Sequence, residues 1–135
     1  MKLKCESVEQ ITVFLENRPG ILADLCAHLS DHRISIRAMS VLDNTNTGIV
    51  RLVVNDSQQA KAALSGAGVA FTTTRCLAVE MPNDPGGLGG VARTLSLAGI
   101  NIDYVYASTL SDSYAALGVF GVSDLDRALS LSWGG

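Results

Sequence analysis

The stretch LENRPGIL at residues 15–22 marks a change of periodicity in the chain. Before it, apolar side chains alternate from Ile11 to Leu15, which is the period of a half-buried strand. After it, apolar side chains recur with the 3.6-residue period of a helix. The Asn-x-Pro-Gly sequence is therefore a strand-to-helix junction. We expect Pro19 to take the first helical position, because proline fixes φ and lacks an N–H, and Gly20 to allow close backbone approach.

The same arrangement returns as MPNDPGGL at residues 81–88. Pro85 follows Pro19 by 66 residues, and this offset also aligns the asparagines, glycines and apolar residues of the two copies. Beyond the following hairpin the offset becomes 68, so we place an insertion of two residues within Ser108–Ser113. A slip confined to a loop is typical of an internal duplication.

Each copy predicts the same order of elements. In the first copy the pattern predicts strands at 10–16, 34–41, 49–54 and 69–74, and helices at 20–32 and 58–64. Asn44–Gly48 is dense in turn residues and is predicted to be a hairpin loop, while Asp56 or Ser57 is expected to cap the short helix. The order βαββαβ predicts an α+β, ferredoxin-like fold with antiparallel sheets.

We expect two tandem modules, 1–74 and 75–135, with no linker between them. The second copy reaches its short helix at 124–132 and then ends without a fourth strand, which would leave a sheet edge open. Three segments could cover that edge: the fourth strand of the first copy, the N-terminal lead Leu3–Val8, or another subunit.

The composition describes a compact protein, with 47% apolar and 17% charged residues. A net charge of −3, with the basic residues scattered, gives no surface for nucleic acid or acidic membranes. The charged N-terminus lacks the apolar segment of a secretory signal, and no later run is long enough to span a membrane. We therefore expect a cytoplasmic protein.

Metal and enzyme chemistry find little support in the sequence. His28 and His32 lie four apart on a predicted helix, but a surface pair is expected rather than a metal site, because the second copy has no counterpart. Cys5, Cys26 and Cys76 show no C-x-x-C spacing. We find no nucleophile motif and no phosphate loop, so we predict no enzyme activity, no metal and no cofactor.

The two junctions, each followed by a helix and an Ile-x-Ile strand, resemble the ACT domain, a small ferredoxin-like module that senses amino acids. The chain is most similar to stand-alone tandem ACT proteins, which have no attached enzyme. The resemblance implies that modules pair side by side and that an amino acid binds at their interface near the strand-one-to-helix-one loop. It also implies a homodimer and a possible partner enzyme.

A serine-sensing member of the family uses an asparagine in this loop and another at the start of strand two. The resemblance places these positions at Asn17 and Ser35 in the first copy and at Asn83 and Asn101 in the second, so the second copy is the better predicted site. Simple turn chemistry is the alternative explanation for Asn17 and Asn83, and holding the loop before strand two in place is the alternative for Asn101. The predicted ligand-binding residues are Asn17, Pro19, Gly20, Ile21, Ser35, Asn83, Pro85, Gly86, Gly87, Leu88 and Asn101.

The sequence thus predicts a small regulatory protein that binds a free amino acid. The alternative is an assembly module that senses nothing and pairs subunits or docks on a partner enzyme. Four glycines at 86, 87, 89 and 90 weaken the start of a helix, which indicates close approach of a ligand or partner backbone, or tight packing of the helix on its own sheet.

Overall fold

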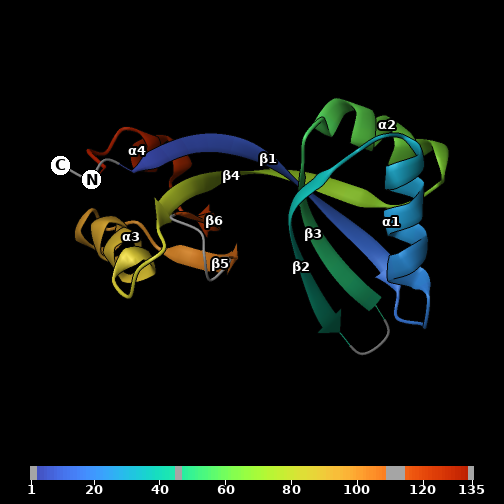
Figure 1. Cartoon of the computed structure of the whole chain (residues 1–135), viewed down its shortest axis with the longest axis horizontal. Coiled ribbons are helices and arrows are strands. Elements are labelled where there is room, and N and C mark those ends of the chain that lie inside the picture. The colour runs from blue at the N-terminus through green and yellow to red at the C-terminus, as the bar shows by residue number, and fades with distance from the viewer. Residues whose placement is uncertain (1–2, 45–46, 109–114, 134–135) are drawn as a thin grey trace. The chain divides into compact units, whose positions relative to one another are not determined.

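A computed structural model of the protein describes residues 3–44, 47–108 and 115–133 (Figure 1). The elements follow in the order β1 (Lys4–Glu16), α1 (Ile21–Asp31), β2 (Ile36–Asn44), β3 (Thr47–Val54), α2 (Ser57–Gly66), β4 (Phe71–Pro82), α3 (Gly87–Leu97), β5 (Ile102–Ser108), β6 (Ala115–Val122) and α4 (Leu125–Leu129). The centre of the predicted hairpin loop at Asn44–Gly48 and nearly all of the predicted insertion at Ser108–Ser113 lie outside the described residues.

The chain forms two compact units. The first unit is Glu9–Thr74, and the second unit is Arg75–Gly135 together with Met1–Val8. The predicted modules 1–74 and 75–135 differ from these units in the position of the N-terminal lead. The physical reason is the length of two strands, because β1 and β4 each continue through both units. The predicted strand at 69–74 is thus only the first part of β4.

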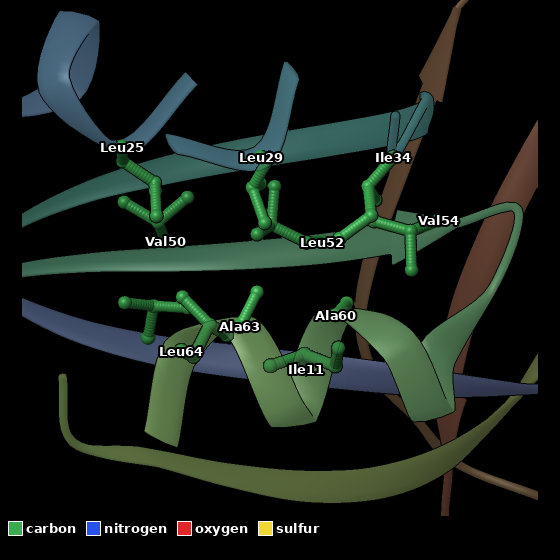
Figure 2. Close-up of a cluster of buried hydrophobic side chains, with 11 residues drawn as sticks. Ile11, Leu25, Leu29, Ile34, Val50, Leu52, Val54, Ala60, Ala63 and Leu64 are labelled. Carbon is green, nitrogen blue, oxygen red and sulfur yellow. The ribbon is translucent and has the colours of Figure 1, made fainter. Parts of the chain in front are cut away.

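The first unit has the strand order β2-β3-β1-β4. Both of its helices cover the same face, because Leu25 and Leu29 of α1 and Leu64 of α2 join strand residues in one core. Figure 2 shows Leu25 beside Val50 and Leu29 beside Leu52 of β3, with Leu64 beside Ala63 on α2. Asp56 caps α2 by accepting a hydrogen bond from the Gln59 N–H, which confirms one of the two predicted caps.

The second unit has the order β1-β4-β6-β5, so the N-terminal half of β1 occupies the place of the fourth strand. Leu3 and Cys5 pack against the core of α3, β4 and β6. Arg75 of β4 donates a hydrogen bond of 3.2 Å to the Ser7 hydroxyl. Of the three candidate segments, the N-terminal lead is the one that lies beside β4 in this unit. The α+β fold of two ferredoxin-like repeats is confirmed.

The expectation that proline begins each helix is wrong. Helix α1 begins at Ile21 with Gly20 as its N-cap, and α3 begins at Gly87 with Gly86 as its N-cap. Gly20 has φ 87°, a left-handed value that cannot be part of a right-handed helix. Pro19 therefore lies in a tight turn that precedes the helix, closed by the Ile21 N–H on the Arg18 carbonyl at 3.3 Å.

The duplication extends to irregular features of the sheets. The β2–β3 register shifts between Ile36 and Ala38, and the β5–β6 register shifts at the equivalent place, between Ile102 and Tyr104. No helix among the described residues is long and apolar enough to cross a membrane.

Candidate functional site

The structure separates the predicted site residues into two groups at opposite ends of helices. Asn83 precedes α3 and Asn101 follows it, so about 16 Å of helix lies between them, at 1.5 Å per residue for 11 residues. Asn17 and Ser35 are separated in the same way by α1, which also has 11 residues. Within one unit, therefore, the loop asparagine and the strand-two position do not form one site.

A cavity of about 260 Å³ lies at the first junction, and we call it the first-junction cavity. It contains three of the predicted residues, Asn17, Gly20 and Ile21. Its other lining residues come from the end of β1, the first turn of α1, and strands β2 and β3: Leu15, Glu16, Arg18, Leu22, Ala23, Val41, Gly48 and Val50. All of them belong to the first unit.

The polar side of this cavity combines one cation, two carboxylates and the start of a helix. The Arg18 guanidinium lies 3.6 Å from Glu16 and 3.8 Å from Asp24, and all three side chains are largely exposed. The first turn of α1 supplies backbone N–H groups at Leu22 and Ala23, ahead of the helix's Asp24-to-Gly20 hydrogen bond. Gly20 provides no side-chain cap, so the positive end of the helix dipole faces the junction. A carboxylate is the complementary ligand group.

The second junction has a carboxylate where the first has Arg18. Asp84 stands at the position that corresponds to Arg18, and its carboxylate accepts a hydrogen bond of 3.0 Å from the Gly86 N–H. The junction thus carries its own anion at the start of α3. Gly87 is buried, and a Cβ at this position would collide with the carbonyl oxygen of Pro82. Leu88 is 46% exposed. Tight packing of the helix on its own strand therefore explains the glycine at 87.

The strand-two positions hold loops in place. The Ser35 N–H donates to the Asn55 side chain at 2.9 Å, and the Asn101 N–H donates to the Ser123 hydroxyl at the same distance. The Asn101 amide also donates to Asp103 at 2.8 Å. An open cavity of about 380 Å³ lies beside Asn101 at the end of α3. These contacts support the structural explanation of Ser35 and Asn101.

The histidine pair is engaged in local hydrogen bonds. His28 Nε2 donates to the Ala63 carbonyl at 2.8 Å, and His32 Nδ1 donates to the His28 carbonyl at 2.9 Å. A nitrogen that donates to a carbonyl carries a proton and cannot ligate a metal through that atom. In the part of the chain that the structure describes, no three His, Cys, Asp or Glu side chains are grouped to hold a metal ion.

Several cavity residues were not among the predicted site residues. Leu15, Val41 and Val50 were attributed to strand patterns alone, which do not show where a helix stops covering the sheet. Arg18 could have been found from the sequence, because the alignment of the two copies sets it against Asp84.

The comparisons with known proteins agree with this architecture. The ACT domain pair family matches residues 6–131, and the chain belongs to this family. It is similar to a structurally determined protein of Bacteroides thetaiotaomicron, with 30% identity and a TM-score of 0.85 over 93% of this chain and 85% of that one. No match was found among curated proteins.

Two further solved structures share the fold. The regulatory subunit of aspartate kinase from Thermus thermophilus, in a ligand-free form, is 17% identical with a TM-score of 0.65, over 89% of this chain and 86% of that one. A structure of aspartokinase alpha and beta subunits is 20% identical with a TM-score of 0.62, over 97% of this chain and 99% of that chain. At these identities the likeness concerns the fold.

Proposed function

We propose that this ACT domain pair is a regulatory protein that binds a free α-amino acid in the first-junction cavity. The observation that carries the proposal is the combination of Arg18, an uncapped helix start and a cavity of about 260 Å³ at one junction. The similarity to a subunit described as regulatory supports a role in regulation. A cytoplasmic location and the absence of enzyme activity are part of the proposal.

The charges of the cavity match those of a free amino acid. The ligand carboxylate would bind Arg18 and the N–H groups of the first turn of α1, and its ammonium group would lie against the Glu16 carboxylate. The ion pairs of Arg18 with Glu16 and Asp24 are exposed, and such pairs contribute only about 0.2–1 kcal/mol. Arg18 can therefore turn toward a ligand at little cost.

The proposed mechanism is linkage between ligand binding and a second equilibrium, such as self-association or docking on a partner enzyme. A ligand shifts such an equilibrium only by its difference in affinity for the two states. That the ligand is held between modules, as the family resemblance implies, stays a prediction. Our proposal places the first junction ahead of the second, because it offers the Arg18 guanidinium where the second junction has Asp84.

The alternative function is assembly without sensing, in which an exposed apolar side chain would contact a partner. Leu97 of α3 is 77% exposed and is the candidate for such a contact. In this case the chain would form a homodimer or bind a partner enzyme with no response to amino acids.

A thermal denaturation screen with each of the twenty amino acids tests the proposal. A ligand at ten times its Kd stabilises the native state by about 1.4 kcal/mol, which raises the melting temperature by several degrees. Arg18→Gln should abolish the shift, whereas Arg93→Gln, an exposed arginine on α3, should retain it. A ligand response that survives Arg18→Gln would place the site elsewhere, and no response to any amino acid would support the assembly function.

A further inference from the structure

We propose that the ligand of the first-junction cavity has a branched aliphatic side chain, as in valine, isoleucine or leucine. This inference rests on the proposed function and adds the class of ligand. It follows from the side of the cavity that faces away from Arg18, which is formed by apolar residues of β1, β2, β3 and α1.

The register of the sheet shows how this apolar wall arises. Val41 of β2 pairs with Val50 of β3, and paired residues on neighbouring strands point to the same face. Val50 is a core residue, 2% exposed, whereas Val41 on the same face is 52% exposed. The apolar surface of the sheet therefore continues from buried Val50 to exposed Val41. Leu22 of α1 lines the same cavity.

Gly48 has no side chain, and this leaves space next to the apolar surface of Val41 and Val50. Leu15 of β1 pairs with Gly48 of β3, while the equivalent pair in the second unit is Met81 with Ala116. The first unit thus has glycine where its duplicate has a methyl group. A second apolar cavity of about 220 Å³ shares Leu15 and Ile21 as lining residues. Leu15 and Ile21 therefore border both cavities.

The size and chemistry of the cavity favour an aliphatic group over a polar one. A cavity of roughly 150 Å³ lined by aliphatic and aromatic residues is large enough to bind benzene, and this one measures about 260 Å³. The polar residues Glu16, Asn17 and Arg18 lie at the end of β1 and in the loop after it, where the carboxylate and ammonium groups would be bound. Among the described lining residues, the strand wall of Val41, Gly48 and Val50 carries no polar side chain, and burying a hydroxyl without a hydrogen bond is unfavourable.

Isothermal titration of the full chain with pairs of amino acids tests the inference. L-Valine and L-threonine have the same shape, so L-valine should bind at least tenfold more tightly if the side chain contacts an apolar wall. Each buried methylene is worth about fourfold in affinity, so L-leucine should bind on the order of fiftyfold more tightly than L-alanine. Equal or tighter binding of L-threonine than of L-valine would overturn the aliphatic inference and leave the proposed function standing. No binding of any amino acid would overturn both.

A cavity-filling variant tests where the side chain lies. A Cβ added at Gly48 would meet the nearest atom, the Leu15 carbonyl oxygen, at 3.7 Å, which is ordinary contact, so Gly48→Val should fold and fill the cavity. It should weaken L-leucine at least tenfold and L-alanine much less. Ala116→Val, at the equivalent position of the second unit, is the control and should retain the preference for L-leucine. Unchanged selectivity in Gly48→Val would refute the placement, and thermal denaturation of both variants verifies that they fold.

Discussion

The glycine pair at the start of α3 offers a sharp test of the packing argument. Gly87 is the first residue of the helix and is buried, and a Cβ there would collide with the carbonyl oxygen of Pro82. Gly89 lies two residues further on, and a Cβ there would meet no described atom within 4 Å. Gly87→Ala and Gly89→Ala have identical compositions, so a difference in stability between them reports on their surroundings alone.

The magnitude follows from two opposing effects. Alanine in place of glycine within a helix stabilises by about 0.5–1 kcal/mol, and Gly89→Ala should gain this amount. Gly87→Ala gains it too, but it overpacks against backbone that cannot easily move, because Pro82 is paired with Ala115 at the end of β4. Overpacking costs about 1–3 kcal/mol or more. The helix gain is common to both variants and cancels, so we expect Gly87→Ala to be the less stable of the two by about 1–3 kcal/mol.

Urea denaturation followed by circular dichroism measures the difference in unfolding free energy. The second unit should lose stability in Gly87→Ala, while amino-acid binding at the first junction should persist at temperatures where the variant is folded. If Gly87→Ala unfolds at the same urea concentration as Gly89→Ala, the collision with Pro82 is relieved at no cost. The reasoning would then be refuted, and close approach of a ligand or partner would again be an explanation for this glycine.

Three further predictions concern the turn, one ion pair and the N-terminal lead. Gly20→Ala should lower the unfolding free energy by about 1 kcal/mol, because φ 87° strains an L-residue, whereas Gly86→Ala at φ −101° should not, as thermal denaturation would show. The hydrogen bond from Lys61, at 2.8 Å, lowers the pKa of Glu9 in the folded state. Its stabilising contribution is therefore present above the unfolded pKa and is lost as pH falls through the lower folded pKa, so Glu9→Gln should flatten the loss of stability in acid titrations. Deletion of residues 1–8 should speed amide hydrogen exchange in the second half of β4; unchanged exchange would mean that the lead does not cover that strand.

Most of the fold could be predicted from the sequence because the same order of strands and helices occurs twice, and each copy supports the assignment of the other. The continuity of β4 was visible as the lack of turn residues between the two copies. The covering segment for the second unit could not be chosen from the sequence, because alternation shows which residues are buried and not which strand lies alongside. The pairing became evident only when Leu3 and Cys5 were found in the second core.

The candidate site was predicted in part. Asn17, Gly20 and Ile21 line the first-junction cavity, as a turn before a helix suggested. The place of Val41 in the cavity could not be predicted from the sequence. A strand residue lines a cavity only where no helix covers it, and the sequence does not show where that cover ends. The prediction of one site from Asn83 and Asn101 took two loop positions as neighbours, although a whole helix separates them within the unit.

Differences between the two copies distinguish fold maintenance from function. Ala38 opposite Val53 in the first unit becomes Tyr104 opposite Gly121 in the second, where the tyrosine ring lies over the glycine. The larger side chain of the pair is Val53 in the first unit and Tyr104 in the second, so the space between the paired residues is filled in both units.

The strand-two loops also keep their hydrogen bond. The backbone N–H of Ser35 donates to the Asn55 side chain and that of Asn101 donates to the Ser123 hydroxyl, so the acceptor is kept whether it is an amide or a hydroxyl. The change from Arg18 to Asp84 is different, because it replaces a set of interactions: the carboxylate partners of Arg18, Glu16 and Asp24, align with Pro82 and Gly90 in the second copy. Of these three aligned positions, only the first copy has a cationic side chain. A ligand that needs a cation at one junction and not at the other would account for it, and this is why Arg18→Gln, rather than a change at either asparagine, is the decisive variant for the proposed function.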